Sequence, residues 1–193
     1  MKMNPTKQQI TYTGIAIAIG LLSALVVRKL TNSYASLSTA ITSAMGNYFT
    51  ITELCASATA KSKGIDNTPT QQARVNLALL IDRVLNPIRE KYGKPIRISS
   101  GYRCPLLNAA VGGVSTSQHL TGQAADLVPT NGGSLADIFR AAIACNNYDQ
   151  LILEKPSTTM WVHVSYSTTP RREILYYNGK SYTNIASNWE KYV

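Results

Sequence analysis

Residues 99–126 contain one of the two histidines of the chain and end in an aspartate. What this stretch can do depends on where the fold places the second histidine relative to these two side chains. The stretch reads SSGYRCPLLNAAVGGVSTSQHLTGQAAD, with His119 seven residues before Asp126, and His163 lies in the strand-like run WVHVSY. Imidazole nitrogens and a carboxylate oxygen suit Zn²⁺, and a catalytic zinc site uses three protein ligands and one water. A fold that joins these three side chains would therefore form a zinc site. The alternative is that each histidine is an ordinary hydrogen-bonded structural residue.

The motifs SGYRxxxxN, SQHxxGxAxD and WVHVS resemble, in order and spacing, those of the zinc D-alanyl-D-alanine carboxypeptidases and L-alanyl-D-glutamate endopeptidases. Members of this family cut the peptide stems of bacterial cell walls, and the resemblance covers about residues 48–167. It implies Zn²⁺ held by His119, Asp126 and His163, and peptidoglycan stem peptides as the substrate. It also implies a hedgehog-like α+β fold, with a small central antiparallel sheet flanked by helices.

Three polar residues near the first motif are candidates for contact with the substrate. Arg103 matches the family's arginine in the glycine turn, and its planar guanidinium suits a substrate carboxylate or an oxyanion. Ser117 matches the serine two residues before the first ligand, and Gln118 follows it. Either of these two side chains would alternatively stabilise its own loop.

A zinc peptidase also needs a carboxylate that moves a proton to the leaving amine. Several family members have an acidic residue three positions before the last histidine, but this chain has Met160 there. The remaining candidates are Asp149 and Glu154. If Glu154 pairs with Trp161 across a hairpin, strand alternation places it on the same face as His163, whereas a slip of one residue would separate them. We therefore expect Glu154 to be the base.

Three functions from different classes remain open at the level of the sequence. The first is a wall-cleaving, endolysin-like metallopeptidase, which the motifs favour. The second is an inactive zinc-bound module that binds peptidoglycan, and the third is a structural envelope or virion component that retains the fold. The sequence does not indicate which bond of the stem peptide is cut, because that choice depends on the shape of the cleft.

The chain has a formal net charge of +9, from 19 basic and 10 acidic residues. Four basic residues precede the first acidic residue, so the remainder carries 15 − 10 = +5. The Lys and Arg residues form no cluster with interleaved aromatic residues, so an anionic wall polymer accounts for the charge as well as nucleic acid does. The motifs, not the charge, make the wall polymer rather than nucleic acid the expected partner. An odd number of cysteines, at positions 55, 104 and 145, argues against a disulfide framework. We expect a monomer with Cys104 as a small buried side chain rather than a nucleophile.

Residues 10–27 carry no charge and would span about 27 Å as a helix, close to the ~30 Å hydrocarbon core of a bilayer. We expect an uncleaved anchor within residues 1–30, with a cleaved signal peptide as the alternative. This segment resembles the N-terminal anchors of some phage lysins, which leaves both host and phage origins open. A Ser/Thr/Ala-rich linker at 31–47 and a catalytic domain at 48–193 would follow, the domain lying outside the cytoplasmic membrane.

Local signals predict the elements of this domain. A core helix is expected to begin at Thr68 as N-cap with Pro69 at its first position, to bend at Pro87 and to end before Gly93. Ser134 and Asp137 form a capping box for a second long helix. Further elements are expected in this order: a strand at 96–99, a short helix from 105 ended by the glycines at 112–113, an antiparallel hairpin from 149–154 and 161–166, and another from 173–177 and 180–182.

Overall fold

A computed structural model describes residues 48–130 and 132–193, all within one compact unit, Ala40–Val193. The expected anchor at 10–27 and the expected linker at 31–47 lie outside the described residues. Within the described part, none of the helices combines the length and the apolar character that crossing a bilayer requires.

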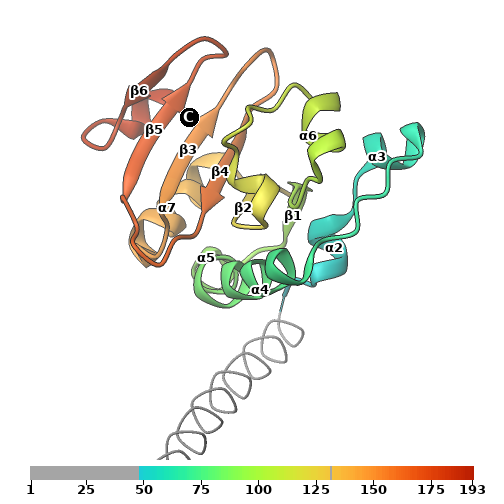
Figure 1. The fold of residues 1–193 in the computed structure, drawn as a ribbon. Coiled ribbons are helices and arrows are strands. Elements are labelled where there is room, and N and C mark those ends of the chain that lie inside the picture. Colours follow the sequence, from blue (N-terminus) through green and yellow to red (C-terminus); the bar gives the residue numbers. More distant parts are fainter. Residues whose placement is uncertain (1–47, 131) are drawn as a thin grey trace, which may run out of the picture. The chain divides into compact units, whose positions relative to one another are not determined.

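The described residues form a six-stranded sheet with helices, in agreement with the expected α+β class (Figure 1). The sheet has the order β1-β2-β4-β3-β5-β6. The strands are β1 (Ile96–Ser100), β2 (Ala124–Pro129), β3 (Gln150–Glu154), β4 (Trp161–Ser165), β5 (Glu173–Tyr177) and β6 (Tyr182–Asn184). The helices are α2 (Ile51–Cys55), α3 (Ala58–Lys63), α4 (Gln71–Leu80), α5 (Asn86–Tyr92), α6 (Pro105–Ala110) and α7 (Leu135–Cys145). A π-helical turn, η1 (Ile81–Leu85), joins α4 to α5, and two short 3₁₀ helices are η2 (Gln118–Thr121) and η3 (Trp189–Tyr192).

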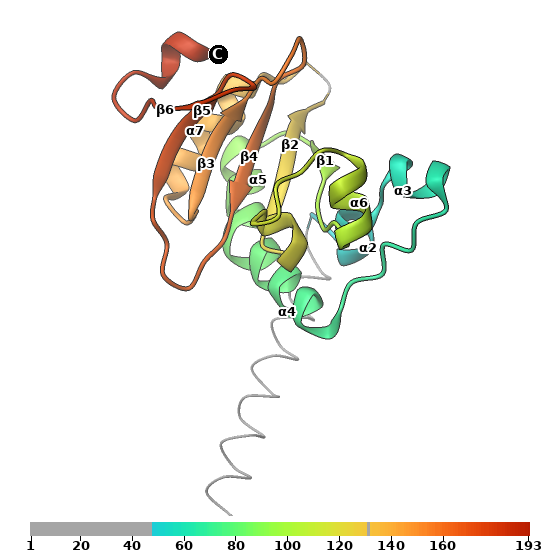
Figure 2. The ribbon, with the colours of Figure 1, turned by 45° about the horizontal axis from the view of Figure 1, so that its top comes forward.

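The two faces of the sheet have different roles because side chains alternate along each strand. One face packs against the helices, and Figure 2 shows α5 and α7 behind the sheet. The side chains on this face of the three central strands are fully buried: Ala125, Leu127, Leu151, Leu153, Val162 and Val164. The opposite face carries Asp126, Glu154 and His163, and this is where the candidate site lies.

The long helix pair begins two residues later than the sequence suggested. Thr70, not Thr68, is the N-cap of α4, and its hydroxyl accepts a hydrogen bond from the Ala73 amide. The Thr68 amide and hydroxyl both donate to the Asp66 carboxylate, so the Thr68 side chain is already engaged in a turn.

Pro87 is the second residue of α5, which continues from the π-helical turn η1 without a break. A proline within a helix has no amide hydrogen to donate and crowds the preceding turn. A local π turn is a known way for a helix to absorb such a disturbance. The helix then ends at Gly93, as expected, with this glycine in the left-handed conformation at φ 74°.

Both expected hairpins are present, although the last strand is Tyr182–Asn184 rather than residues 180–182. The expectation of an antiparallel sheet was wrong. β3 pairs with β4 antiparallel, with Glu154 opposite Trp161, and β5 pairs with β6 antiparallel. However, β5 lies beside β3 and runs parallel to it, so the sheet is mixed. The hairpin signals in the sequence are local and contain no information about how one hairpin pairs with the other.

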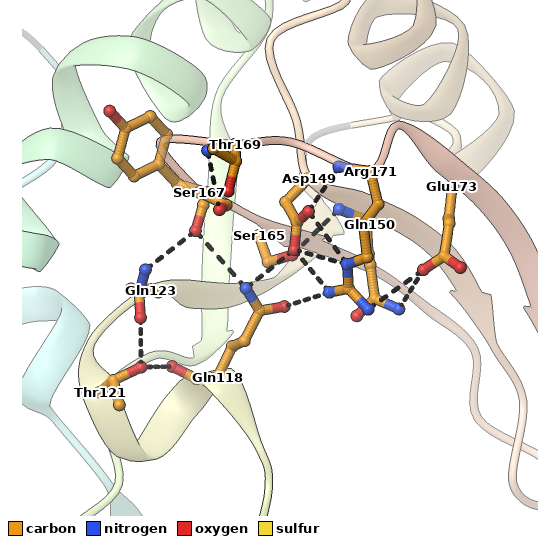
Figure 3. Close-up of polar contacts among 11 residues, drawn as sticks. Gln118, Thr121, Gln123, Asp149, Gln150, Ser165, Ser167, Thr169, Arg171 and Glu173 are labelled. Atoms are coloured by element: carbon orange, nitrogen blue, oxygen red, sulfur yellow. Dashed lines mark hydrogen bonds and ion pairs between the residues drawn. The ribbon is translucent and has the colours of Figure 1, made fainter.

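The loop that returns the chain from β4 to β5 is held by the buried carboxylate of Asp149, which is only 2% exposed. This carboxylate accepts hydrogen bonds from the Arg171 amide at 2.8 Å and from the Arg171 guanidinium, and also from Gln118 Nε2 at 3.0 Å (Figure 3). Arg172 then adopts a left-handed conformation at φ 57°, where the chain turns into β5. Asp149 therefore holds the loop that carries the chain from β4 past β3 to β5. This connection places β5 parallel to β3 and makes the sheet mixed.

The Asp149–Arg171 contact predicts a pH-dependent stability. Burial opposes ionisation of Asp149, but the hydrogen bonds from Arg171 and Gln118 outweigh it and lower the pKa of this carboxyl. A folded-state pKa below the unfolded value stabilises the fold above the unfolded pKa of about 4, and this contribution disappears as the pH falls through the folded pKa. Asp149→Asn should therefore lower the free energy of unfolding at pH 6 and have a smaller effect near pH 3, as measured by urea unfolding.

The matched control is Glu173→Gln, because Glu173 contacts the same guanidinium at 3.2 Å but its side chain is 41% exposed. The Glu173 variant should change stability less at pH 6. An Asp149→Asn effect of the same size at both pH values would show that the carboxylate charge does not stabilise this loop.

Candidate metal centre

His119 is positioned by η2, a single 3₁₀ turn between the β1–α6 region and β2. The Ser117 hydroxyl caps this turn by accepting a hydrogen bond from the His119 amide, and Gly122 ends it at φ 73°. A Cβ atom at Gly122 would lie 2.6 Å from the carbonyl oxygen of Ala73 in α4. Glycine is therefore required there both by the backbone conformation and by the close approach of the helix.

Asp126 and His163 are directly opposite each other on the neighbouring strands β2 and β4. Their side chains leave the same face of the sheet, and η2 places His119 above them. All three side chains are buried, with exposed fractions of 2% for His119, 4% for Asp126 and 7% for His163. The structure thus brings together the three residues that the sequence proposed as metal ligands.

The three candidate ligand atoms form a nearly equilateral triangle. The distances are 3.2 Å from His119 Nε2 to His163 Nδ1, 3.0 Å from His163 Nδ1 to Asp126 Oδ1, and 3.3 Å from His119 Nε2 to Asp126 Oδ1. Tetrahedral zinc with ligands at about 2.1 Å would separate neighbouring ligand atoms by roughly 3.4 Å. The donor set therefore fits one zinc ion in chemistry and in spacing.

The remaining polar atoms of two of these groups have protein partners that fix their orientation. His119 Nδ1 donates to the Gly101 carbonyl at 2.7 Å, so its proton is on Nδ1 and the lone pair of Nε2 faces the centre of the triangle. Asp126 Oδ2 accepts from Arg103 Nη2 at 3.2 Å, which leaves Oδ1 for the other two members. This is the arrangement expected around metal ligands rather than around isolated histidines.

The charge of Asp126 is maintained in spite of its burial. Burial opposes ionisation, but His119 and His163 beside the carboxyl outweigh this effect and hold the pKa of Asp126 well below its usual range. The carboxyl is therefore ionised at neutral pH, which is the form that binds a metal.

Glu154 lies at the edge of the triangle. It is opposite Trp161, as the sequence predicted, and its side chain is therefore on the same face of the sheet as His163. Its Oε1 atom is 3.8 Å from His163 Nδ1. Burial is the main cause of a raised pKa at Glu154; the neighbouring Asp126 carboxylate adds to the rise, and interactions with His163 and Arg103 partly oppose it. A carboxyl with a raised pKa beside a metal centre is suited to accept and return a proton. Asp149, the other candidate, is instead bound by Arg171.

Arg103 holds several parts of the site together. Its guanidinium donates to Ser100 Oγ at 2.9 Å, to Asn108 Oδ1 at 3.3 Å and to Asp126 Oδ2 at 3.2 Å. Its backbone amide donates to the His119 carbonyl at 3.1 Å. These contacts describe a residue that positions Asp126 and η2, while contact of Arg103 with a substrate stays a prediction.

Ser117 and Gln118 also have partners within the protein. Ser117 caps η2, and Gln118 bridges the Asp149 carboxylate and Arg171, with its Oε1 accepting from Arg171 Nη2 at 3.3 Å (Figure 3). These are the loop-stabilising roles that the sequence left open as the alternative to substrate binding. A substrate contact of either residue stays a prediction.

Gly101 is a residue of the site whose role the motif alone did not indicate. A Cβ atom there would lie 2.1 Å from the Leu54 carbonyl oxygen, and this same oxygen accepts a hydrogen bond from the Tyr102 amide at 2.7 Å. The turn therefore packs directly on α2, which places the Gly101 carbonyl against His119. The glycine in SGYR was visible in the sequence, but the helix against which it packs was not.

Cys104 is buried and caps α6, with its sulfur accepting from the Leu107 amide at 3.5 Å. All three cysteines are free thiols. The expectation of a small buried side chain at Cys104 is thus confirmed.

Comparison with known proteins agrees with the motifs and with the geometry. A family model described as Peptidase M15 matches residues 47–165, a range that includes the three candidate ligands and Glu154. A search of the curated proteins found no match. The matched range is more than half of the 193 residues, and the chain belongs to the M15 family of peptidases.

Proposed function

We propose that this protein is a zinc-dependent peptidase that hydrolyses peptide bonds in the stem peptides of bacterial peptidoglycan. The observation that carries the proposal is the buried triangle of His119, Asp126 and His163, with Glu154 beside it, in a chain of the M15 family. The motif resemblance supports the choice of peptidoglycan as substrate, and the net charge of +9 is compatible with an anionic polymer.

Each residue has a separate role in this proposal. His119, Asp126 and His163 would hold the zinc ion, which would supply a lowered pKa for a bound water and polarisation of the scissile carbonyl. Glu154 takes a proton from the attacking water and returns it to the nitrogen of the leaving amine. Arg103 orients Asp126 through its hydrogen bond to Oδ2, and a contact with a substrate carboxylate or an oxyanion is the second role proposed for it.

The first prediction concerns the metal. The purified protein should bind about one Zn²⁺ per chain, and His119→Ala or His163→Ala should lose most of it because only two ligands remain. Metal analysis by mass spectrometry measures this. Glu154→Gln is the control and should keep its zinc. Full zinc occupancy in both histidine variants would show that the ligand set is wrong.

The second prediction concerns the base. Glu154→Gln should lower the rate of peptidoglycan hydrolysis about 100-fold or more, because glutamine cannot accept the proton. The assay is digestion of purified peptidoglycan by the zinc-loaded protein, followed by mass analysis of the fragments. Asp149→Asn is the control that removes a carboxylate already engaged by Arg171. If that variant were inactive and Glu154→Gln fully active, Glu154 would not be the base.

A second candidate function is a zinc-bound module that binds wall peptides without cleaving them. One observation favours it, namely Met160 at the position where several family members have the acidic residue. The same digestion distinguishes the two functions, since a zinc-loaded protein that binds peptidoglycan and releases no fragments would be such a module.

We further propose that the domain works outside the cytoplasmic membrane, tethered by residues 10–27. The support is the location of the proposed substrate together with the length of this uncharged run. Basic residues flank the run on both sides, so the charge rule does not determine its orientation. Protease added to intact spheroplasts should digest the domain, and a protected C-terminus would place it on the inner side.

A further inference from the structure

The face of the sheet that carries the candidate site continues beyond Glu154 onto β5 and β6. Glu154 is opposite Tyr177 in the parallel β3–β5 pair, and Tyr177 is opposite Tyr182 in the antiparallel β5–β6 pair. Residues directly opposite each other share a face of the sheet. The two tyrosines therefore extend the Glu154 side of the site towards the edge of the sheet at β6, which Figures 1 and 2 show beside β5.

Tyr177 and Tyr182 form a stacked pair, with ring centroids 4.6 Å apart and an angle of 28° between the ring planes. Tyr182 is 58% exposed although it is a large aromatic residue. Burial raises the pKa of the Tyr182 hydroxyl.

Tyr176, on the other face of β5, belongs to an aromatic pair with a different role. It packs with Tyr192 of η3, with ring centroids 4.8 Å apart, and both residues lie against the hydrophobic core. The Tyr177–Tyr182 pair does not belong to that core. β5 thus contributes one ring to a structural pair on one face and one ring to a more accessible pair on the face of the site.

The proposed role of Glu154 determines which part of a substrate lies over this accessible pair. A group that returns a proton to the leaving nitrogen must come within hydrogen-bond reach of it, about 2.6–3.2 Å. The leaving nitrogen then lies at Glu154, and Tyr177 and Tyr182 are the side chains that continue the same face beyond Glu154.

The chemistry of the amine side is that of a peptide-binding surface rather than a carboxylate pocket. Side chains that share this face on β3, β5 and β6 include Ile152, Glu154, Leu175, Tyr177, Tyr182 and Asn184, and the lysines that flank these strands, Lys155 and Lys180, lie in loops rather than on the face. A carboxypeptidase must recognise the terminal carboxylate next to the scissile bond, for which a positively charged partner is the usual solution. Two stacked rings near the edge of the sheet instead provide a flat apolar surface, on which a substrate peptide that continues beyond the scissile bond can pack.

We infer that Tyr177 and Tyr182 form a subsite for the peptide on the amine side of the scissile bond, and that the enzyme is an endopeptidase that prefers at least two residues on that side. This inference rests on the proposed function. It assigns the substrate class within peptidoglycan and adds two residues that determine specificity.

The test uses two synthetic peptides that contain the bond identified in the peptidoglycan digest. One has a single residue after the bond, with a free carboxylate, and the other has three. The zinc-loaded protein should cleave the longer peptide with a kcat/KM at least about tenfold higher. Tyr182→Ala should remove most of this preference through a higher KM for the longer peptide, leaving the shorter peptide and the zinc content unchanged.

Two further variants make the result specific. Tyr182→Phe retains the ring and should retain the preference. Tyr192→Ala removes a ring from the structural pair on the opposite face and should also retain it. An equal or higher kcat/KM for the shorter peptide, or a preference unchanged in Tyr182→Ala, would overturn the inference while leaving the peptidase activity in place. Failure to cleave either peptide or peptidoglycan would overturn the proposed function, and the inference with it.

Discussion

The buried carboxylate of Asp126 is the group on which the rest of the site depends. An ionised carboxylate in a protein interior is stable only if charged and hydrogen-bonding partners surround it. Here the partners come from three separate parts of the chain: Arg103 in the turn after β1, His119 in η2 and His163 in β4. Satisfying one charge therefore requires the β2–β4 pairing, the glycine turn and the short helix to form together. The same requirement presents two imidazoles and one carboxylate oxygen to a common point.

The sheet separates this polar group from the core. Strand alternation places the apolar side chains of β2, β3 and β4 against the helices and the site residues on the other face. The pairing of Glu154 with Trp161 is what brings Glu154 to His163, because a shift of one residue would turn the carboxylate into the core. The register of one hairpin thus decides whether the metal centre has a base. The parallel addition of β5 then extends this face with Tyr177 and Tyr182.

Much of this site was predictable because its signals are local or depend only on strand period. The Glu154–Trp161 register and the capping box of α7 follow from residue type and alternation, and the grouping of His119, Asp126 and His163 was expected from the resemblance of their motifs to a zinc peptidase family. Three features of the structure could not be predicted from these local signals. The N-cap moved from Thr68 to Thr70 because Asp66 engages the Thr68 side chain. The sheet is mixed because Asp149 and Arg171 fix a loop crossing that no hairpin signal describes.

The third feature is the set of contacts made by Arg103, Ser117 and Gln118, which the motif alone suggested as residues that face the substrate. In the structure they hold Asp126, the start of η2 and the Asp149 cluster, respectively. A motif indicates that a polar side chain belongs near a site, but packing decides whether its hydrogen bonds are directed at the protein. Gly101 shows the same limit, since its close approach to Leu54 depends on the docking of α2.

The most direct test of this account is anomalous diffraction at the zinc absorption edge from crystals of the zinc-loaded protein. The account predicts one strong peak among His119, Asp126 and His163, within about 2.0–2.2 Å of His119 Nε2, of the facing nitrogen of His163 and of Asp126 Oδ1. The Gly101 and Arg103 contacts should be unchanged around it. An empty triangle in crystals whose zinc lies elsewhere on the chain would contradict the account.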